Sequence, residues 1–322
     1  MDRSGSAFVF PGLGPTVFGD SARFMLVSRP ARELLAVADE ALGYSLFERY
    51  SAERADGDYA TATQLAFFVN CLALATYAER ELGAQPQVLA GPSFGGRCTA
   101  AYSGALGVAD AVRMTERWAR CVDDYFACEH TDLVTLSFTR TPAAALKEIR
   151  AELDGLGEWH DLSCHIDEDF FMVSLRQGRV EWLERRIRAA GGFSLYTMRP
   201  AMHASVLTRL RDRVAEEVFG DLPFADPRLP VIRDQDGVTV TTAAGVRAML
   251  LDGFVGTVRW PAVVGALRDH GVGTLYVTGV DNLFGRVGCT VRNFQVVTVN
   301  PRLALRPRPR VPYLSMAAAE PA

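Results

Sequence analysis

The stretch LAGPSFGG, residues 89–96, joins an apolar segment to a run of small residues through a turn rich in glycine. Residues 87–90 before the turn predict a buried strand, and residues 96–103 after it predict a helix packed closely against that strand. A serine with glycine two positions away on each side is typical of a nucleophile elbow, which holds the serine hydroxyl above a sheet. Glycine is needed there because side chains in so tight a turn would strike the neighbouring backbone. The stretch therefore predicts an α/β fold with Ser93 exposed at a strand-to-helix turn.

Strands and helices alternate on both sides of this turn, which predicts a mostly parallel sheet covered on both faces. The expected strands cover residues 7–10, 87–90, 229–233 and 274–278, and the expected helices cover residues 32–50, 63–82, 96–103, 110–126, 205–219, 243–251 and 260–270. We expect the apolar segment 63–82 to be a largely buried helix, and residues 302–312 to form a surface tail.

The pattern changes between residues 128 and 198, where short strands flank two helices in the order β-α-β-α-β. The expected strands are 133–138, 170–175 and 193–198, and the expected helices are 142–153 and 180–190. We therefore predict a large α/β-hydrolase-like subdomain formed by residues 1–127 and 199–322, with a small ferredoxin-like subdomain, residues 128–198, inserted into it.

Composition excludes several classes of function. The 322 residues carry a formal net charge of only −4 and no basic stripe interleaved with aromatic residues, so we expect no nucleic-acid partner. The six cysteines are scattered without a C-x-x-C pair, which indicates reduced thiols in a cytoplasmic protein, and the cysteines and histidines lack the spacing of a metal site. Residues 1–7 lack a basic segment followed by a long apolar run, so we expect no signal peptide. No uninterrupted apolar run is long enough to span a bilayer, so we expect no membrane association.

A nucleophilic serine needs a base within hydrogen-bond reach. Four of the five histidines lie in polar, loop-like segments, where a solvated histidine is the simpler interpretation. His203 differs, because it follows the segment RPAM and lies just before the helix expected from Ser205. His203 is therefore the candidate base for Ser93.

Several segments together resemble one family, the malonyl-CoA:acyl carrier protein transacylases and the acyltransferase domains of polyketide synthases. The matching segments, in chain order, are FVFPGLGPT (Phe8 to Thr16), TATQLAFF (Thr61 to Phe68), LAGPSFGGRCTAAYSGALGVADAVRM (Leu89 to Met114), RPAMH (Arg199 to His203) and LYVTG (Leu275 to Gly279). The resemblance covers most of the chain, with the ferredoxin-like insert in the same place.

The resemblance implies a role for each matching residue. Ser93 would be the nucleophile and His203 its base, as a catalytic dyad. The backbone amides of Leu13 and Phe94 would form the oxyanion hole, and a backbone carbonyl near Gly253 would orient the histidine. The reaction would be a two-step transfer: a phosphopantetheine thioester, delivered on an acyl carrier protein or coenzyme A with no bound cofactor, acylates the serine, and a second thiol then takes the acyl group.

The sequence departs from the family beside the predicted nucleophile. Leu13 stands where the family has glutamine, Pro92 where it has histidine, and Gly96 where it has glutamate. Gln64, Met202 and Pro92 are expected to contribute to substrate binding.

The most informative departure is Trp118. Malonyl-type members place an arginine at this position, where it pairs with the free carboxylate of the extender unit. Arg117 and Arg120 are near in sequence but point about 100° and 200° away on a helix. An indole cannot pair with a carboxylate, so Trp118 favours an uncharged acyl chain. The alternative is that Trp118 fills the core and an arginine comes from elsewhere in the chain.

These observations together predict a discrete, trans-acting acyltransferase of polyketide biosynthesis. It would move a non-carboxylated acyl group, such as the aminoacyl or peptidyl starter of a macrolactam, between acyl carrier proteins. The alternatives are an editing acyl-carrier-protein hydrolase, a conventional malonyl-CoA transacylase, and a carrier-binding scaffold without activity.

Carrier proteins are acidic, so exposed arginines are candidates for the docking surface. The candidates are Arg185, Arg186, Arg188, Arg286, Arg292 and Arg302. The acidic run 167–169 is expected to be a solvated turn, with contact to a substrate amine as the other interpretation. We expect the protein to be a monomer.

Overall fold

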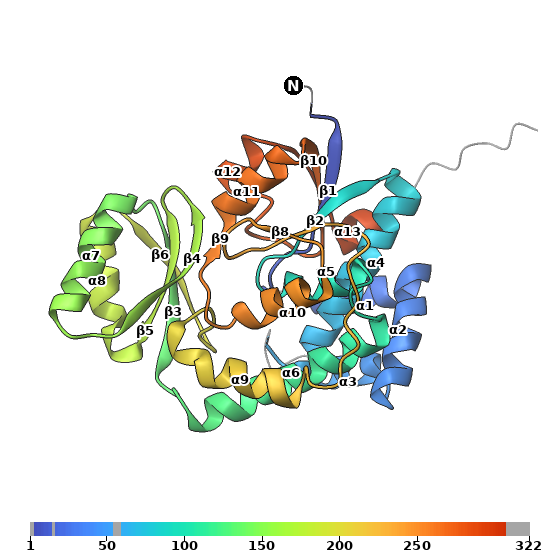
Figure 1. Ribbon diagram of the computed structural model, residues 1–322, viewed down its shortest axis with the longest axis horizontal. Coiled ribbons are helices and arrows are strands. Elements are labelled where there is room, and N and C mark those ends of the chain that lie inside the picture. The colour runs from blue at the N-terminus through green and yellow to red at the C-terminus, as the bar shows by residue number, and fades with distance from the viewer. Residues whose placement is uncertain (1–2, 15–16, 54–58, 307–322) are drawn as a thin grey trace, which may run out of the picture.

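The computed structural model describes residues 3–14, 17–53 and 59–306. Within these residues the strands form two sheets, one in a larger and one in a smaller part of the molecule (Figure 1). The predicted α/β class, with a mostly parallel sheet and a small ferredoxin-like insert, is confirmed.

The larger sheet has the strand order β11-β10-β1-β2-β7-β8. Neighbouring strands are parallel from β11 to β7, and β8 pairs antiparallel with β7 at one edge. Its strands are β1 (Gly5–Val9), β2 (Pro86–Ala90), β7 (Val231–Ile232), β8 (Thr239–Val240), β10 (Val272–Thr278) and β11 (Gln295–Val299).

Both faces of this sheet are buried, which explains why its central strands are apolar throughout. In β1 and the residue after it, Phe8 and Phe10 pack into the core that holds helix α4, whereas Ala7 and Val9 pack into the core that holds α11. The helices of this larger part are α1 (Phe18–Val27), α2 (Arg29–Leu42), α3 (Leu46–Ala52), α4 (Thr61–Leu82), α5 (Gly95–Tyr102), α6 (Val108–Cys128), α9 (Thr208–Glu217), α10 (Ala243–Asp252), α11 (Trp260–Asp269), α12 (Gly288–Val291) and α13 (Pro301–Ala304), with a 3₁₀ turn at Ser205–Leu207 before α9.

Helix α4 is the central helix of the larger part. By length and composition alone it could cross a membrane, but 83% of its most apolar window is buried inside the protein. Its apolar character is therefore explained by packing against α2, α6 and the sheet.

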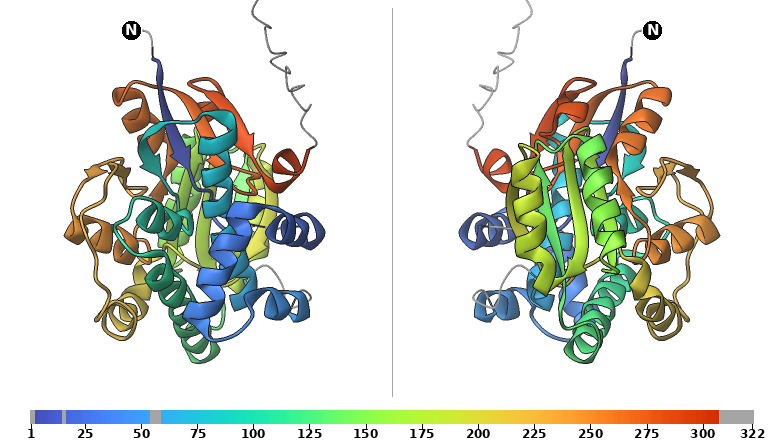
Figure 2. Two further views of the ribbon diagram at one scale, coloured as in Figure 1. Left: turned by 90° about the vertical axis from the view of Figure 1, so that its right-hand side faces the viewer. Right: turned by 90° about the vertical axis from the view of Figure 1, so that its left-hand side faces the viewer.

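The smaller part contains a second sheet with the strand order β6-β3-β5-β4-β9. Its elements are β3 (Leu133–Thr139), α7 (Ala143–Gly155), β4 (His160–Asp167), β5 (Phe170–Arg176), a 3₁₀ turn (Gln177–Arg179), α8 (Val180–Ala189), β6 (Phe193–Met198) and β9 (Val258–Arg259). Helices α7 and α8 cover the face of this sheet that points away from the larger part, as Figure 2 shows from the side. The short strand β9 comes from the later part of the chain, so that part contributes to both sheets.

Several expected elements differ from the observed ones. The helix expected over 32–50 is two helices, because Gly43 takes a left-handed conformation with φ 74° and Ser45 caps α3 through the Glu48 amide. Strand β4 was not expected, although Leu162, Cys164 and Ile166 alternate with polar residues as a strand requires. Helix α1 and strand β11 were not expected from the sequence either.

The acidic run and the C-terminal tail also need correction. Asp167 is not a solvated turn residue, because it is buried at the end of β4, and only the next two residues form the exposed turn to β5. The segment expected as a tail begins inside α13, and residues 307–312 of that expectation lie outside the described residues.

Candidate active site

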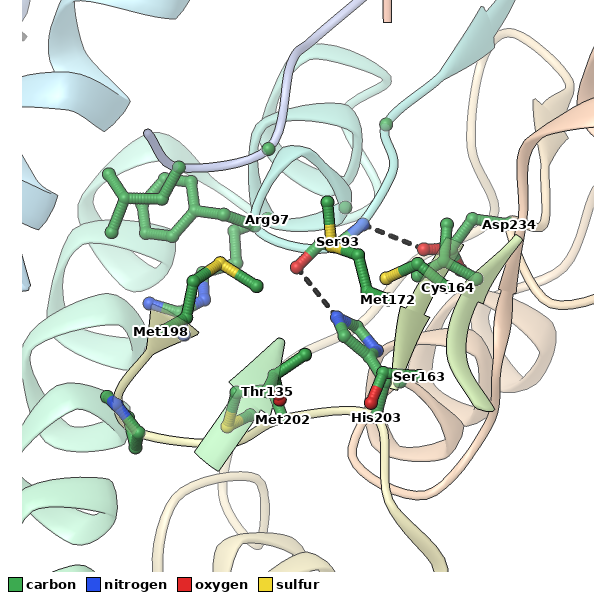
Figure 3. Close-up of a pocket in the computed structure, with 18 of the residues that line it drawn as sticks. Ser93, Arg97, Thr135, Ser163, Cys164, Met172, Met198, Met202, His203 and Asp234 are labelled. Carbon is green, nitrogen blue, oxygen red and sulfur yellow. Dashed lines mark hydrogen bonds between the residues drawn. The ribbon is translucent and has the colours of Figure 1, made fainter. Parts of the chain in front are cut away.

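The predicted elbow lies between β2 and α5. Ser93 has a left-handed backbone with φ 55°, a conformation that costs free energy for any residue except glycine. A Cβ atom at Gly91 would lie 2.3 Å from the carbonyl oxygen of Gly95, and one at Gly95 would lie 1.9 Å from the carbonyl oxygen of Phe10. Both glycines are therefore required by close backbone contacts, and the turn presents the serine hydroxyl to a cavity (Figure 3).

His203 lies beside the serine. Its Nε2 atom is 2.9 Å from Ser93 Oγ, a hydrogen-bond distance (Figure 3). Burial lowers the pKa of His203 to about 4, against the opposing effect of the backbone carbonyls of Gly253 and Gly256. The imidazole is therefore neutral at pH 7 and can accept the serine proton.

The Nδ1 atom of His203 is buried and makes no hydrogen bond of standard geometry among the described residues. The carbonyls that act on the ring are those of Gly253, the position expected from the resemblance, and of Gly256. Both belong to the loop after α10, so backbone groups rather than a carboxylate surround this side of the histidine.

Asp234 supports the elbow from a strand that sequence reasoning did not connect to it. Its Oδ2 atom accepts a hydrogen bond of 2.7 Å from the backbone N–H of Ser93. Asp234 is only 5% exposed, and burial raises its pKa to about 6, although the Ser93 amide opposes this shift. It lies two residues after β7, which pairs with β2, so the carboxyl ends of two adjacent parallel strands bring the two residues together. The sequence signal for this role was an acidic residue directly after the strand predicted over residues 229–233.

Two backbone amides next to the serine are free to bind an oxyanion. Leu13 and Phe94 both line the cavity, and neither backbone N–H has an acceptor among the described residues. Both residues line the cavity that Ser93 also lines, so these amides stay the predicted oxyanion hole.

The cavity has a volume of about 170 Å³ and lies between the two sheets. The elbow, α6 and the loop around His203 form one side, and the small sheet supplies Thr135, Ser163, Cys164 and Met172 from its inner face (Figure 3). Three of the four residues predicted to bind substrate line the cavity, namely Gln64, Trp118 and Met202. Pro92 is buried and does not line it, because it is packed behind the elbow.

Trp118 is both a core residue and a wall of the cavity. Its indole stacks on Phe254 with a centroid distance of 4.7 Å and an interplanar angle of 20°, and it is 5% exposed. Arg117 donates to the Glu217 carbonyl and Arg120 pairs with Glu116 at the surface, so neither arginine replaces the family arginine in the cavity.

A different arginine lines the cavity, and sequence reasoning missed it. The guanidinium carbon of Arg97 lies 4.2 Å from the Trp118 ring centroid and 4.5 Å from that of Phe94. Its Nη1 atom donates a hydrogen bond of 3.2 Å to Oε1 of Gln64. Its place in the first turn of α5, the helix that directly follows the elbow, was the signal that could have revealed it.

The acidic run lies away from the cavity. Asp167 accepts hydrogen bonds from the backbone amides of Cys289 and Glu168, and Glu168 pairs with Arg292 at 3.0 Å. These contacts join the small sheet to α12 and leave the run outside the cavity lining. The interpretation that this run contacts a substrate amine is therefore wrong.

The candidate carrier-binding arginines fall on separate surfaces. Those of α8 lie on the face of the small sheet opposite the cavity, where Arg186 pairs with Glu152 (Figure 1). Arg302 pairs with Asp20, and Arg286 is exposed two residues beyond Phe284, which lines the cavity.

The described residues hold no group of three or more histidine, cysteine, aspartate or glutamate side chains placed to bind a metal ion. All six cysteines belong to this described part and are free thiols.

Comparison with known proteins places these features in a family context. Residues 137–198 match the family model described as the VinK acyltransferase small domain. The chain is 25% identical over 302 residues to the malonyl CoA-acyl carrier protein transacylase of Salmonella typhimurium, with 91% of this chain and 94% of the relative covered. The Escherichia coli K12 transacylase gives 25% identity over 303 residues, with the same shares covered.

Solved structures share the fold. A malonyl-transacylase solved in complex with a type II PKS acyl-carrier protein superposes with a TM-score of 0.82 at 20% identity, covering 94% of this chain and 99% of that one. FabD from Acinetobacter baumannii gives a TM-score of 0.81 at 20% identity, covering 94% and 96%. The expected relationship to the transacylase family is confirmed.

Proposed function

Because the chain is related over most of its length to the malonyl CoA-acyl carrier protein transacylases, we propose that it is an acyltransferase that works through an acyl ester of Ser93. The observation that carries the proposal is the 2.9 Å contact between Ser93 Oγ and His203 Nε2 beside two free backbone amides. A serine, a neutral base and oxyanion donors are the groups that acyl transfer from a thioester requires.

The first step acylates the enzyme. Ser93 Oγ attacks the thioester carbonyl carbon while His203 Nε2 takes its proton. The amides of Leu13 and Phe94 bind the oxygen that becomes negative, and the carbon–sulfur bond then breaks. The leaving thiolate takes the proton from the imidazolium, so that His203 is neutral again.

The second step reverses these roles with another thiol. His203 removes the proton of the acceptor thiol, whose sulfur attacks the ester carbonyl of acylated Ser93. The bond from carbon to Ser93 Oγ breaks, and the imidazolium returns the proton to the serine. We propose that donor and acceptor are phosphopantetheine thiols of acyl carrier proteins, because the relatives are named for that partner and one neighbour was solved with it.

The walls of the cavity support an acyl group without a free carboxylate. By the resemblance, Trp118 stands where malonyl-type members place the carboxylate-binding arginine, and it lines the cavity with Met172, Met198 and Met202. The alternative, an arginine from elsewhere in the chain that pairs with a carboxylate, has a candidate in Arg97, which lines the same cavity. We therefore propose a neutral chain, such as an aminoacyl or peptidyl group. We further propose a discrete enzyme of polyketide assembly, including macrolactam assembly. The match to an acyltransferase small domain supports acyl transfer, and the neighbour solved with a type II PKS acyl-carrier protein supports the polyketide context.

A single-turnover experiment tests this function. Acyl carrier protein loaded with a neutral aminoacyl thioester is mixed with enzyme, and the acyl-enzyme and free acid are followed by intact-protein and small-molecule mass spectrometry. We expect a Ser93 ester that decays on addition of a second carrier, with the acyl group recovered on that carrier. Release of free acid at a rate unaffected by the acceptor would identify a hydrolase instead. Carrier binding without any Ser93 ester would identify a scaffold.

A further inference from the structure

Arg97 places a buried cation in the proposed acyl cavity. The residue is only 7% exposed, and it lines the cavity together with Ser93 and Trp118. Burial lowers the pKa of its guanidinium to about 9, so the group still carries its charge at neutral pH. An arginine this deeply buried normally has partners for its hydrogen-bond donors.

The contacts of Arg97 leave most of these donors unused. A guanidinium has five N–H donors, and among the described residues Arg97 makes a single hydrogen bond, from Nη1 to Gln64. No carboxylate in the described part of the chain lies within ion-pair distance of it. Its charge is instead stabilised by the rings of Phe94 and Trp118, whose centroids lie 4.5 and 4.2 Å from the guanidinium carbon.

A second donor in the same cavity also lacks an acceptor. The indole N–H of Trp118 is buried and has no hydrogen-bond partner among the described residues. The Trp118 N–H is enclosed, with almost no accessible surface, so an oxygen atom in the cavity reaches the unused donors of Arg97 and not this one.

The location of Arg97 relative to Ser93 fits a ligand attached to the serine. Ser93 lies two residues before α5 and Arg97 is the third residue of that helix, and both line the same cavity. In the view of Figure 3, Arg97 and Met198 lie to one side of the Ser93–His203 pair, and Asp234 and Cys164 lie to the other. An acyl chain on Ser93 that extends toward Trp118 therefore passes the guanidinium.

We propose that Arg97 is a specificity-determining residue that donates hydrogen bonds to a carbonyl oxygen within the acyl chain, an amide oxygen of an aminoacyl or peptidyl group. The inference rests on the proposed acyl-enzyme function. The Phe94 and Trp118 rings already stabilise the charge of the Arg97 guanidinium. Its unused N–H groups therefore need only an oxygen lone pair, which a neutral carbonyl supplies. Arg97 thus selects for an oxygen-bearing chain in a cavity whose other walls are largely apolar.

Three acyl chains of equal length test the inference on the wild-type enzyme. N-acetylglycyl, pentanoyl and glutaryl pantetheine thioesters share a five-atom chain, and they carry an internal amide, no acceptor and a terminal carboxylate respectively. Ser93 acylation rates are measured by rapid quench and mass spectrometry, and each is divided by the rate of the same thioester with hydroxylamine to remove intrinsic reactivity. We expect the normalised rate for N-acetylglycyl to exceed that for pentanoyl by about 10- to 100-fold, the range for a hydrogen bond to a charged group.

The variant Arg97→Met, which keeps a long side chain without donors, assigns the preference to this residue. We expect the ratio of N-acetylglycyl to pentanoyl to fall to near one, whereas Arg113→Met on the exposed face of α6 keeps the wild-type ratio. Near-ultraviolet circular dichroism reports whether the Arg97→Met variant is folded. If the variant does not fold, the comparison of the three thioesters on the wild-type enzyme still tests the inference.

Each other outcome has a definite meaning. A normalised wild-type ratio near one, or an unchanged ratio in folded Arg97→Met, would overturn the inference while leaving the acyl-enzyme intact. A glutaryl rate above the N-acetylglycyl rate would assign Arg97 to a carboxylate and overturn the choice of an amide. If none of the three thioesters acylates Ser93, the proposed function fails rather than the role of Arg97.

Discussion

Ser93 and His203 both have left-handed backbones, with φ values of 55° and 60°. Such conformations cost about 1–3 kcal/mol each and persist only where surrounding contacts hold them. The Ser93 backbone is held by a hydrogen bond from its N–H to the Asp234 carboxylate. The elbow is held by Gly91 and Gly95, whose lack of a side chain lets backbone atoms of neighbouring segments lie against them. The serine and its base are therefore fixed before substrate binds, which favours rapid acylation.

The bond from Asp234 to the Ser93 amide gives a prediction at this scale. Asp234→Ala leaves a buried N–H without an acceptor, and we expect a loss of about 1–3 kcal/mol in the free energy of unfolding, measured in urea. Asp234→Asn keeps an acceptor oxygen and should lose less. Equal stability of the alanine variant and the wild type would show that this bond does not hold the elbow.

The lowered pKa of His203 predicts the pH dependence of acylation. The base must be neutral to take the serine proton, so the rate falls only as the pH falls toward the folded pKa of about 4. In the Asp234→Asn variant we expect acylation by a non-ionising thioester, measured by quenching at fixed times, to be nearly constant from pH 8 to about pH 5.5. This variant is used because its parent carboxyl has a pKa of about 6 and would produce a separate inflection there. A half-maximal rate near pH 6.5 in that variant would contradict the burial of the histidine.

Substitution of the base itself should remove most of the activity. We expect His203→Ala to slow Ser93 acylation by about 10²- to 10⁴-fold, the usual contribution of a general base, without unfolding the protein. Intact-protein mass spectrometry over time measures the rate. A loss of less than about threefold would exclude His203 as the base.

At the scale of elements, the site depends on how closely β1, β2 and α5 approach one another. Gly95 at the start of α5 lies against Phe10, the residue after β1, and Gly91, the residue after β2, lies against Gly95 in turn. The sequence predicts these close contacts, because glycines at this spacing after an apolar strand are typical of a tight strand-to-helix turn. Strand β4, by contrast, was hidden by its polar residues, although its apolar positions alternate correctly.

Gly95→Ala tests this close approach. Its Cβ would lie 1.9 Å from the Phe10 carbonyl oxygen, so the helix or the strand must move, and we expect a loss of at least about 1–3 kcal/mol in unfolding free energy together with slower acylation. The matched control is Gly265→Ala in α11, where no atom lies within 4 Å of the added Cβ. That change should be neutral or stabilising by up to about 1 kcal/mol. Equal effects of the two substitutions would contradict the packing described here.

For the whole molecule, the cavity between the two sheets is the feature that local sequence patterns could not provide. The elbow and His203 were recognisable because each lies in a short motif, and the α/β class followed from alternating strands and helices. Asp234 and Arg97 were not, because their roles depend on strand order and on which residues surround a cavity. Trp118 was identified as the decisive departure, but the arginine stacked against it was found only in three dimensions.

The arrangement of the two parts also separates the candidate docking arginines. Arg286 lies beyond a cavity-lining residue, whereas Arg185 on α8 lies on the far face of the small sheet. We expect Arg286→Glu to raise the KM for an acyl carrier protein substrate by up to about tenfold at low salt and to leave the KM for a pantetheine thioester unchanged. Arg185→Glu should have little effect on either. The opposite ranking would place the carrier on the outer face of the small subdomain.

The proposed preference for a neutral acyl group is tested most directly by the time course of Ser93 acylation. The enzyme is given equal concentrations of a neutral amide-bearing thioester and a malonyl thioester, the adducts are measured by intact-protein mass spectrometry, and Ser93→Ala is the blank. We expect the neutral acyl group to appear on the wild-type protein, to map to Ser93 after proteolysis, and to form faster than the malonyl adduct. Faster malonyl loading, or an adduct that persists in Ser93→Ala, would contradict the function proposed for this cavity.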